Sequence, residues 1–367
     1  MKIALITIHN ANNYGAVLQA YATKKILSQY GETSTIDYEN RFLNHHLDIL
    51  RFDMSVHGIK KLVHDILRFP YRLKAIGRFK NFIKSNMNLT QKLSADGLMQ
   101  GKAGKFDIYI CGSDQIWNPE IVSEDKFIDP IFFLSFANKG AKKLSYASST
   151  GHHNYTDKEK KELAKLLEDF NLITTRESDG VKKLQEILPN RDIHHVLDPT
   201  LLLSKEEWLE ALDIKLEEPK EKYILVYSVP RTELIRKAID YYAYKLNMKV
   251  VAIDQMLFPL SKKIDTHIKD AGPKEFIELY ANASFVITDS FHGTCFAVNF
   301  GKPFVSISAG KRANRIISLL SILNINERLV NSEEEFAIIK TDTFNMNILK
   351  KLVSIRQESL ILLDEFI

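Results

Sequence analysis

One histidine of this 367-residue chain stands where proton-transfer chemistry is expected. His292 lies in the polar turn 288–293, directly after the β-branched and aromatic run 285–288 and before a segment of small residues. This pattern predicts a strand, a turn and a helix. Ligands of open α/β sheets bind at the carboxyl ends of strands, where the dipole of a helix N-terminus favours an anion. Because an imidazole titrates near neutral pH, His292 could give or take a proton there. The alternative is a histidine that only stabilises a buried turn.

Four other loops at predicted strand ends carry residues suited to anions or hydroxyl groups. Glycine allows a ligand to approach the backbone, serine and glutamine offer donors, and arginine can bind a carboxylate or phosphate with two hydrogen bonds. Asp114 could act as a base or orient a hydroxyl, and Trp117 could offer a flat apolar face to a ligand ring. The candidate residues of these four loops are Asn13 and Gly15; Gly112, Ser113, Asp114, Gln115 and Trp117; Arg176; and Lys311 and Arg312. The turn of His292 adds Ser290 and Gly293.

Three of these loops also have a purely structural interpretation. An asparagine before a helix commonly caps it, so Asn13 could serve only the helix that follows. Asp114 after Gly-Ser could cap a turn. Arg176 could pair with Glu177 or Asp179 and shape its loop.

Strands and helices alternate along the whole chain, as they must to bring these loops to common sheet edges. Strands are predicted near 2–8, 33–37, 106–111, 143–149, 172–175, 195–197, 223–229, 249–253, 285–288 and 303–307, with helices between most of them. Such alternation predicts parallel sheets with right-handed crossovers. We therefore expect an α/β protein of two Rossmann-like domains that face each other across a cleft.

The length of the chain suits two domains with separate cores. We expect an N-terminal domain at 1–205 with a helical insertion at about 41–100, a C-terminal domain at 206–345, and a last helix at 346–367 that crosses back to the first domain.

Neither a signal peptide nor an apolar run of membrane-spanning length is apparent, which predicts a cytoplasmic protein. The net charge of +4 gives no case for nucleic acid. Neither CxxC nor HExxH spacing occurs, so no metal is predicted.

The segment 41–84 is unusually basic, with ten lysines and arginines against three acidic residues. Leucine, isoleucine and phenylalanine recur in it at helical spacing, and Pro70 interrupts the pattern. Such helices can lie on an anionic membrane surface or cover an anionic substrate. The alternative is a helical insertion whose lysines are simply solvated.

At these loops the chain resembles the polysaccharide pyruvyl transferases. The resemblance rests on four ordered motifs: Asn-Tyr-Gly followed by Ala-Val-Leu-Gln-Ala-Tyr-Ala at 13–22, Gly-Ser-Asp-Gln-Ile-Trp-Asn at 112–118, Thr-Arg-Glu at 175–177, and Ser-Phe-His-Gly at 290–293 with Gly-Lys-Pro at 301–303. It spans about residues 1–330 and implies a glycosyltransferase-B-like fold. It also implies transfer of pyruvate from phosphoenolpyruvate, the donor substrate, onto two hydroxyls of a sugar as a cyclic ketal, with no further cofactor.

The resemblance also implies roles for particular residues. His292 would be the acid, or donate to the phosphate, and Arg176 would match the family's donor-binding arginine. Many members carry an arginine where this chain has Ser290, so Lys311 or Arg312 would replace that charge unless the donor is bound differently. The implied acceptor is a sugar or lipid-linked oligosaccharide of a bacterial surface polysaccharide. Two alternatives remain: a nucleotide-sugar-dependent glycosyltransferase, and a non-catalytic polysaccharide-assembly protein on the same fold.

Overall fold

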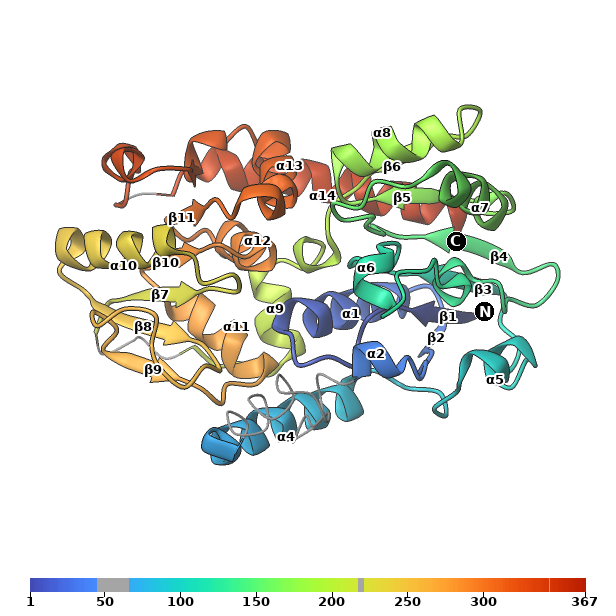
Figure 1. The fold of residues 1–367 in the computed structure, drawn as a ribbon, viewed down its shortest axis with the longest axis horizontal. Helices are drawn as coiled ribbons and strands as arrows, with labels where there is room; N and C mark the ends of the chain where they lie inside the picture. Colours follow the sequence, from blue (N-terminus) through green and yellow to red (C-terminus); the bar gives the residue numbers. More distant parts are fainter. Residues whose placement is uncertain (45–65, 217–220, 343) are drawn as a thin grey trace. The chain divides into compact units, whose positions relative to one another are not determined.

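The chain divides into two compact units, each built on a parallel β-sheet, in a computed structural model that describes residues 1–44, 66–216, 221–342 and 344–367 (Figure 1). Unit 1 holds the described residues of 1–47, 83–202 and 354–367. Unit 2 holds those of 48–82 and 203–353. The predicted α/β class with two Rossmann-like domains is therefore confirmed.

Unit 1 has a four-stranded sheet in the order β2-β1-β3-β4. Bridges from Leu144 to Leu172 and from Ser148 to Thr175 connect it to the pair β5-β6, and every pairing is parallel. The apolar residues of these short runs are almost fully buried, as expected for strands covered on both faces. The strands are β1 (Lys2–Ile6), β2 (Glu32–Thr35), β3 (Ile108–Cys111), β4 (Lys142–Ser145), β5 (Ile173–Thr175) and β6 (Ile193–His195).

Helices with well-defined caps connect the strands of unit 1. The Thr156 and Glu159 side chains form a capping box at the start of α7, and Asn118 caps α6. One core cluster joins the sheet to aromatic residues of the loop after β3, including Trp117, Phe132 and Phe133. The helices are α1 (Tyr14–Leu27), α2 (Arg41–Asn44), α5 (Ala95–Met99), α6 (Pro119–Val122), α7 (Asp157–Leu167) and α8 (Ser178–Ile187), with the 3₁₀ turns η2 (Pro130–Phe133) and η3 (Pro199–Leu201).

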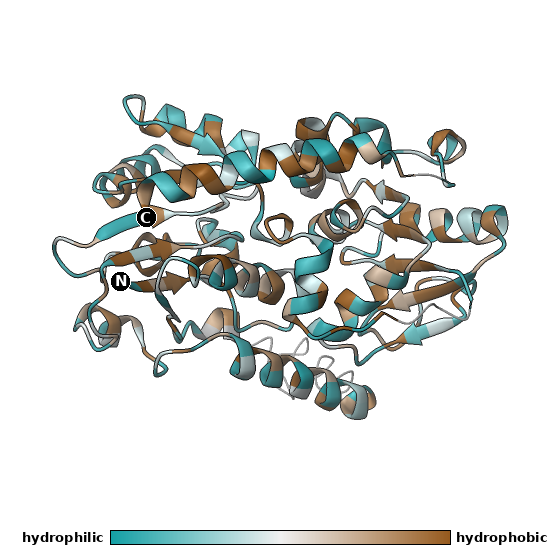
Figure 2. Ribbon diagram, turned by 180° about the vertical axis from the view of Figure 1, so that it is seen from behind, coloured by the Kyte–Doolittle hydropathy of each residue, from teal (hydrophilic) through white to brown (hydrophobic). Residues whose placement is uncertain are grey.

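Unit 2 has a six-stranded parallel sheet in the order β12-β11-β10-β7-β8-β9. Its strands are coloured mostly as hydrophobic in Figure 2. The strands β9 and β12 were not predicted, because β9 (Thr-His-Ile) contains one apolar residue and β12 has only two residues. The strands are β7 (Tyr223–Tyr227), β8 (Lys249–Ile253), β9 (Thr266–Ile268), β10 (Phe285–Thr288), β11 (Phe304–Ile307) and β12 (Leu329–Val330).

Both faces of the unit 2 sheet are covered. Ile224 and Ile287 pack with residues of α10, while Tyr227 on the opposite side of the pleat contacts Phe276 of α11 at 5.0 Å between ring centroids. The elements are α9 (Lys205–Ala211), α10 (Glu233–Leu246), α11 (Pro273–Asn282), α12 (Phe291–Asn299) and α13 (Asn314–Leu323), with η4 (Gly310–Ala313), η5 (Asn326–Arg328) and η6 (Glu333–Ile338).

Two helices have residues in both units. Residues 69–82 of α4 (Phe69–Asn86) group with unit 2, and residues 354–367, which include the end of α14 (Met346–Phe366), group with unit 1.

The basic segment 41–84 is described only in part, because 45–65 lie outside the described residues. Its described cations are not all solvated, since Arg68 and Arg72 are buried and Arg78 pairs with Glu275 at 3.1 Å. No helix within the described ranges is long and apolar enough to cross a bilayer.

Candidate functional site

The turn between β10 and α12 is fixed by side-chain hydrogen bonds at the carboxyl edge of the unit 2 sheet. The Thr288 hydroxyl donates to the Tyr227 carbonyl at 2.7 Å and accepts from the Ser290 amide at 3.1 Å. Ser290 is the N-cap of α12, and its hydroxyl accepts from the Gly293 amide at 3.3 Å. His292 is therefore held in the first turn of a helix that starts at a sheet edge, as the sequence predicted for this stretch.

Gly293 is required for the close packing of this helix start. A Cβ at this position would lie 2.2 Å from the Thr288 Oγ1 and 2.9 Å from the Tyr280 hydroxyl. Real side chains do not approach this closely, so only glycine lets α12 begin directly beside β10. The contribution of Gly293 is therefore to the geometry of the turn, since it leaves the space that a side chain would fill.

His292 is buried, with 7% of its surface exposed, and its ring packs edge-on against Phe291 with centroids 5.1 Å apart. The Arg315 guanidinium lies 5.7 Å from the centroid of the same Phe291 ring. Arg315 sits in the first turn of α13, so a cation lies near the start of α12. The sequence pointed to the neighbouring Lys311 and Arg312, whose backbone forms η4 but whose side chains lie outside the described residues.

Asp289 joins this turn to the loop after β7. Its carboxylate accepts from the Ser228 hydroxyl at 2.7 Å and from the Val229 amide at 2.8 Å. Burial raises the pKa of the Asp289 carboxyl, and the hydrogen bonds from Ser228 and Val229 act in the opposite direction. In the same loop Arg231 has a φ of 55° and pairs with Asp254. Polar residues at the carboxyl edge of the unit 2 sheet therefore include positions that the sequence analysis did not single out.

In unit 1, Asn13 and Gly15 form the start of α1. The Asn13 side chain accepts from the Ala16 amide at 3.1 Å, which confirms the helix-capping interpretation. Gly15 is buried in the first turn. Both residues are therefore accounted for by the helix, and a role in donor binding stays a prediction.

The turn after β3 holds Asp114 in an unusual backbone conformation. Its φ of 74° lies in the left-handed region, and its Oδ1 accepts from the Gln115 amide at 2.9 Å. Backbone strain of this kind concentrates at functional sites, where the surrounding contacts impose it. The Gln115 side-chain oxygen accepts from Asn118 at 3.0 Å, and a Cβ on Gly112 would come within 3.0 Å of Thr7. The predicted turn-capping role of Asp114 is therefore present, and its carboxylate also remains at the edge of the sheet.

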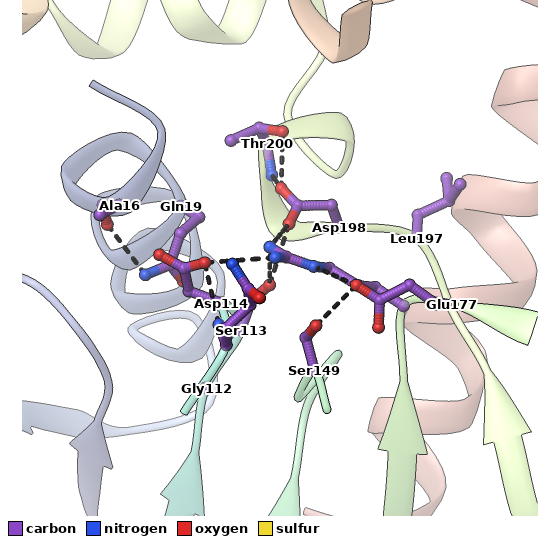
Figure 3. A network of polar contacts seen from close by, with 12 residues as sticks. Ala16, Gln19, Gly112, Ser113, Asp114, Ser149, Glu177, Leu197, Asp198 and Thr200 are labelled. Carbon is purple, nitrogen blue, oxygen red and sulfur yellow. Dashed lines mark hydrogen bonds and ion pairs between the residues drawn. The ribbon is translucent and has the colours of Figure 1, made fainter. Parts of the chain in front are cut away.

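Arg176 lies at the centre of a buried polar network. Figure 3 shows its partners Asp114, Glu177 and Asp198. Its side chain has no exposed surface, and it forms ion pairs with Asp114 at 3.2 Å, Glu177 at 3.0 Å and Asp198 at 2.8 Å. Burial alone would lower the pKa of Arg176, but Glu177, Asp198 and Asp114 together raise it. The guanidinium is therefore a fixed cation.

The network connects four strand-end loops of unit 1, those that follow β3, β4, β5 and β6. Ser113 accepts from Arg176 at 3.0 Å and donates to Asp198 at 2.9 Å, while Ser149 donates to Glu177 at 2.7 Å. The predicted ion pair between Arg176 and Glu177 is confirmed. Asp179 instead pairs with Lys183 at 2.8 Å. Sequence reasoning missed Asp198, for which the only signal was a second acid at a strand end, in Asp-Pro-Thr.

The prediction that Trp117 offers a flat apolar face to a ligand ring needs correction. Its side chain is buried, with 1% of the surface exposed, and it stacks on Phe133 at 5.3 Å between centroids. Its indole N–H donates to the Phe132 carbonyl at 3.2 Å. A ring in this environment is part of the core, because both its apolar surface and its donor are already used.

The structure thus brings together two groups of predicted residues, one in each unit. Ser113, Asp114 and Arg176 contact one another in unit 1, and Ser290, His292 and Gly293 form one turn in unit 2. Among the residues that the structure describes, no cluster of three or more His, Cys, Asp or Glu side chains could hold a metal ion.

Comparison with known proteins gives one family and one fold. The family model described as polysaccharide pyruvyl transferase matches residues 13–310. No curated protein gives a significant match. Among solved structures, the UDP-GlcNAc 2-epimerase from Methanocaldococcus jannaschii is similar at 13% identity and a TM-score of 0.51, covering 98% of this chain and 100% of that one. The S. aureus MnaA–UDP co-structure is similar at 12% identity and a TM-score of 0.50, covering 96% and 90%. These likenesses show the glycosyltransferase-B fold.

Proposed function

Since the chain belongs to the polysaccharide pyruvyl transferase family, we propose that it transfers pyruvate from phosphoenolpyruvate onto two hydroxyls of a sugar as a cyclic ketal. The product would be part of a bacterial surface polysaccharide. The observation that carries this proposal is the position of His292 in the first turn of α12, at the carboxyl edge of the unit 2 sheet. An anion at this helix start would lie beside a group able to transfer a proton.

The reaction needs proton transfer at a carbon and stabilisation of phosphate. A proton added to the methylene carbon of phosphoenolpyruvate gives an oxocarbenium-like centre, which the first sugar hydroxyl attacks with loss of its own proton. The second hydroxyl then displaces inorganic phosphate and closes the ketal. One diol and one phosphoenolpyruvate therefore give one pyruvyl ketal and one phosphate. We propose that His292 supplies the proton that is added to the methylene carbon.

The donor carries a carboxylate and a phosphate, so it requires cations. We propose that Arg315, in the first turn of α13, supplies one of them, and that Lys311 and Arg312 of η4 supply others in place of the arginine that Ser290 replaces. Ser290 caps α12 at the position where many members of the family have that arginine. The positive charge for the donor would therefore come from η4 and the start of α13 rather than from the start of α12.

In unit 1 we propose that Asp114 orients an acceptor hydroxyl, next to the backbone of Gly112, Ser113 and Gln115. Arg176, which the family resemblance assigns to the donor, already contacts three carboxylates. We therefore propose that Arg176 acts as a positioning residue that holds Asp114, rather than as the donor clamp.

The histidine assignment is tested with His292→Asn, which fills a similar volume but cannot act as an acid. We expect release of phosphate from phosphoenolpyruvate, with glycosides that carry two free hydroxyls, to fall by about 10²- to 10⁴-fold. Mass spectrometry of the glycoside would follow the pyruvyl group. His194→Asn, at a half-buried histidine of β6, is the matched control. An unchanged rate in His292→Asn, with an unchanged thermal midpoint, would remove the histidine from the mechanism.

The second candidate is a nucleotide-sugar-dependent glycosyltransferase. It is favoured by the likeness in fold to a protein solved with UDP, since a diphosphate also suits a helix N-terminus. Thermal-shift measurements separate the two, because a ligand that binds the folded protein raises its midpoint by mass action. A shift with phosphoenolpyruvate supports pyruvyl transfer, and a shift with nucleotide sugars alone supports the second candidate. No shift with either at millimolar concentration favours a non-catalytic assembly protein.

We also propose that the acceptor is lipid-linked and that the described part of the basic segment contacts an anionic membrane. Ile66, Leu67, Phe69, Tyr71 and Leu73 are exposed near the start of α4, and Lys80 and Lys84 are exposed further along it. Exposed apolar and basic residues on one helix suit an anionic lipid surface. Flotation with anionic vesicles at low salt tests this, and binding should weaken for Leu67→Ser/Tyr71→Ser. An absence of flotation would remove the membrane contact.

A further inference from the structure

Unit 2 contains a cavity that the proposed reaction does not use. It has a volume of about 730 Å³ and is lined by the end of α13, the segment 338–340 and the first turns of α14. This volume is within the usual range for small-molecule sites, about 300–1,000 Å³. Leu323, Ile325 and Ile348 give it apolar walls, and polar side chains share the lining. The cavity therefore has the composition expected of a ligand site.

The charged side chains of the cavity are mainly cations. Arg328, Lys340 and Lys351 line it, against the single acid Glu327. Within the described part of the chain, neither Lys340 nor Lys351 has an ion-pair partner. Surface lysines are usually solvated, but here two of them share one concave surface with an arginine. An anion in the cavity would therefore be attracted from several sides.

Arg328 gives the cavity a preformed positive charge. Only 6% of this residue is exposed, and its guanidinium donates to the Phe304 carbonyl at 3.2 Å and to the Lys340 carbonyl at 2.7 Å. Burial lowers the pKa of Arg328, with a smaller opposite effect from Glu327. The surroundings therefore disfavour this charge, and a bound anion would stabilise it.

The N-terminus of α14 adds to the positive electrostatic potential of the cavity. Asn345, Asn347 and Ile348 bring the N-terminus of α14 to the cavity, where the helix dipole is positive. The C-terminus of α13 has the opposite sign, but amides of Asn324 and Ile325 donate to its Leu320 carbonyl. The asparagine side chains also supply amide donors of the kind that bind phosphate oxygens.

We propose that this cavity binds a phosphorylated small molecule of about sugar-phosphate or mononucleotide size. The site is separate from the candidate donor site. Arg328 contacts the carbonyl of Phe304, the first residue of β11, whereas His292 follows the carboxyl end of β10. Because β10 and β11 are parallel, the two sites lie at opposite edges of the unit 2 sheet.

Calorimetric titration of the full chain with glucose 1-phosphate, and with glucose as the neutral probe, tests the site. We expect saturable binding of glucose 1-phosphate only, and at least a 10-fold weaker affinity in Lys340→Gln/Lys351→Gln. Lys262→Gln/Lys263→Gln, which removes two exposed lysines elsewhere in unit 2, should bind as the parent does. Hydrogen exchange should slow at 345–351 when the ligand is bound.

Two further outcomes decide the proposal. His292→Asn should keep the affinity for glucose 1-phosphate, which would separate this site from the donor site whether or not pyruvyl transfer is correct. Equal affinity in both double variants, or a lack of saturation at tens of millimolar glucose 1-phosphate, would overturn the proposal. Inorganic phosphate should compete, because the cations are proposed to bind the phosphate group, and a failure to compete would contradict that role.

Discussion

Arg176 shows how much the surroundings of a residue decide its role. Its type and position at a strand end suit a clamp for an anionic donor. In the structure its side chain is fully buried, and Asp114, Glu177 and Asp198 surround it. Its main effect is to neutralise these acids and fix their loops, so its contribution to chemistry would pass through Asp114.

Replacing Arg176 should therefore cost stability. We expect Arg176→Met to lower the free energy of unfolding by about 3–5 kcal/mol, because buried carboxylates lose their partner. Urea denaturation at pH 7 measures this. The control is Lys183→Met, which removes the more exposed ion pair with Asp179 and should cost about 0–1 kcal/mol. If Arg176→Met is as stable as the control, the network does not stabilise unit 1.

Lys302, just before β11, gives a pH-dependent prediction. Burial, together with the charge of Lys205, lowers its pKa from 10.5 to about 8. Between these two values the unfolded chain binds more protons than the folded protein, so stability rises with pH there. At pH 7 both states are charged and the cost of burying the charge is fully present.

Lys302→Met should remove that cost. We expect it to be more stable than the parent at pH 7 by about 1–2 kcal/mol, a value reduced because the side chain is partly in water. The difference should shrink as pH rises from 8 towards 10.5. Denaturation midpoints across this range measure it, with the exposed Lys262→Met as a control that should show no such trend. A constant difference would contradict the lowered pKa.

At the scale of elements, the β10–α12 turn depends on packing that leaves no room for a side chain. Ser290 caps the helix, Thr288 ties the turn to β7, and Gly293 allows the helix to touch the strand. The direction of His292 follows from these contacts. Changes that move the start of α12 should therefore affect activity without touching the histidine itself.

Gly293→Ala tests this dependence. The new Cβ would lie 2.2 Å from the Thr288 Oγ1, and we expect a loss of about 1–3 kcal/mol from overpacking together with reduced phosphate release. Gly77→Ala is the matched control, because a Cβ at this position of α4 meets nothing within 4 Å. It should stabilise the protein by about 0.4–1 kcal/mol. Equal thermal midpoints for the two variants would contradict the packing argument.

At the scale of the whole molecule, the chain leaves unit 1 and returns to it at its end. The Arg356 guanidinium donates to the Leu201 carbonyl at 2.6 Å, and the Leu197 amide donates to the Ser359 hydroxyl at 3.2 Å. Leu363 of the same helix is almost fully buried. Residues 354–367 are therefore part of the core and hydrogen bonding of unit 1, although they are last in the sequence.

Removal of residues 354–367 should destabilise unit 1 selectively. We expect faster hydrogen exchange in β5, β6 and η3, while the amides of β7, β10 and β11 keep their protection. Ile361→Ala, at an exposed position of α14, should change neither. Uniform loss of protection in both units would show that they do not unfold separately.

The sequence by itself determined the alternation of strands and helices, because period and turn residues are local properties. It also located the turns that carry His292 and Asp114, since a strand followed by a polar turn marks a sheet edge. Only the tertiary structure decided what surrounds these residues. Trp117 and Arg176 became buried, and Arg315 came near Phe291, because contacts between distant segments fix burial and partners. The same reason explains why Asp198 stood out only as an acid at a strand end, and why the cavity at Arg328 leaves no pattern in the sequence.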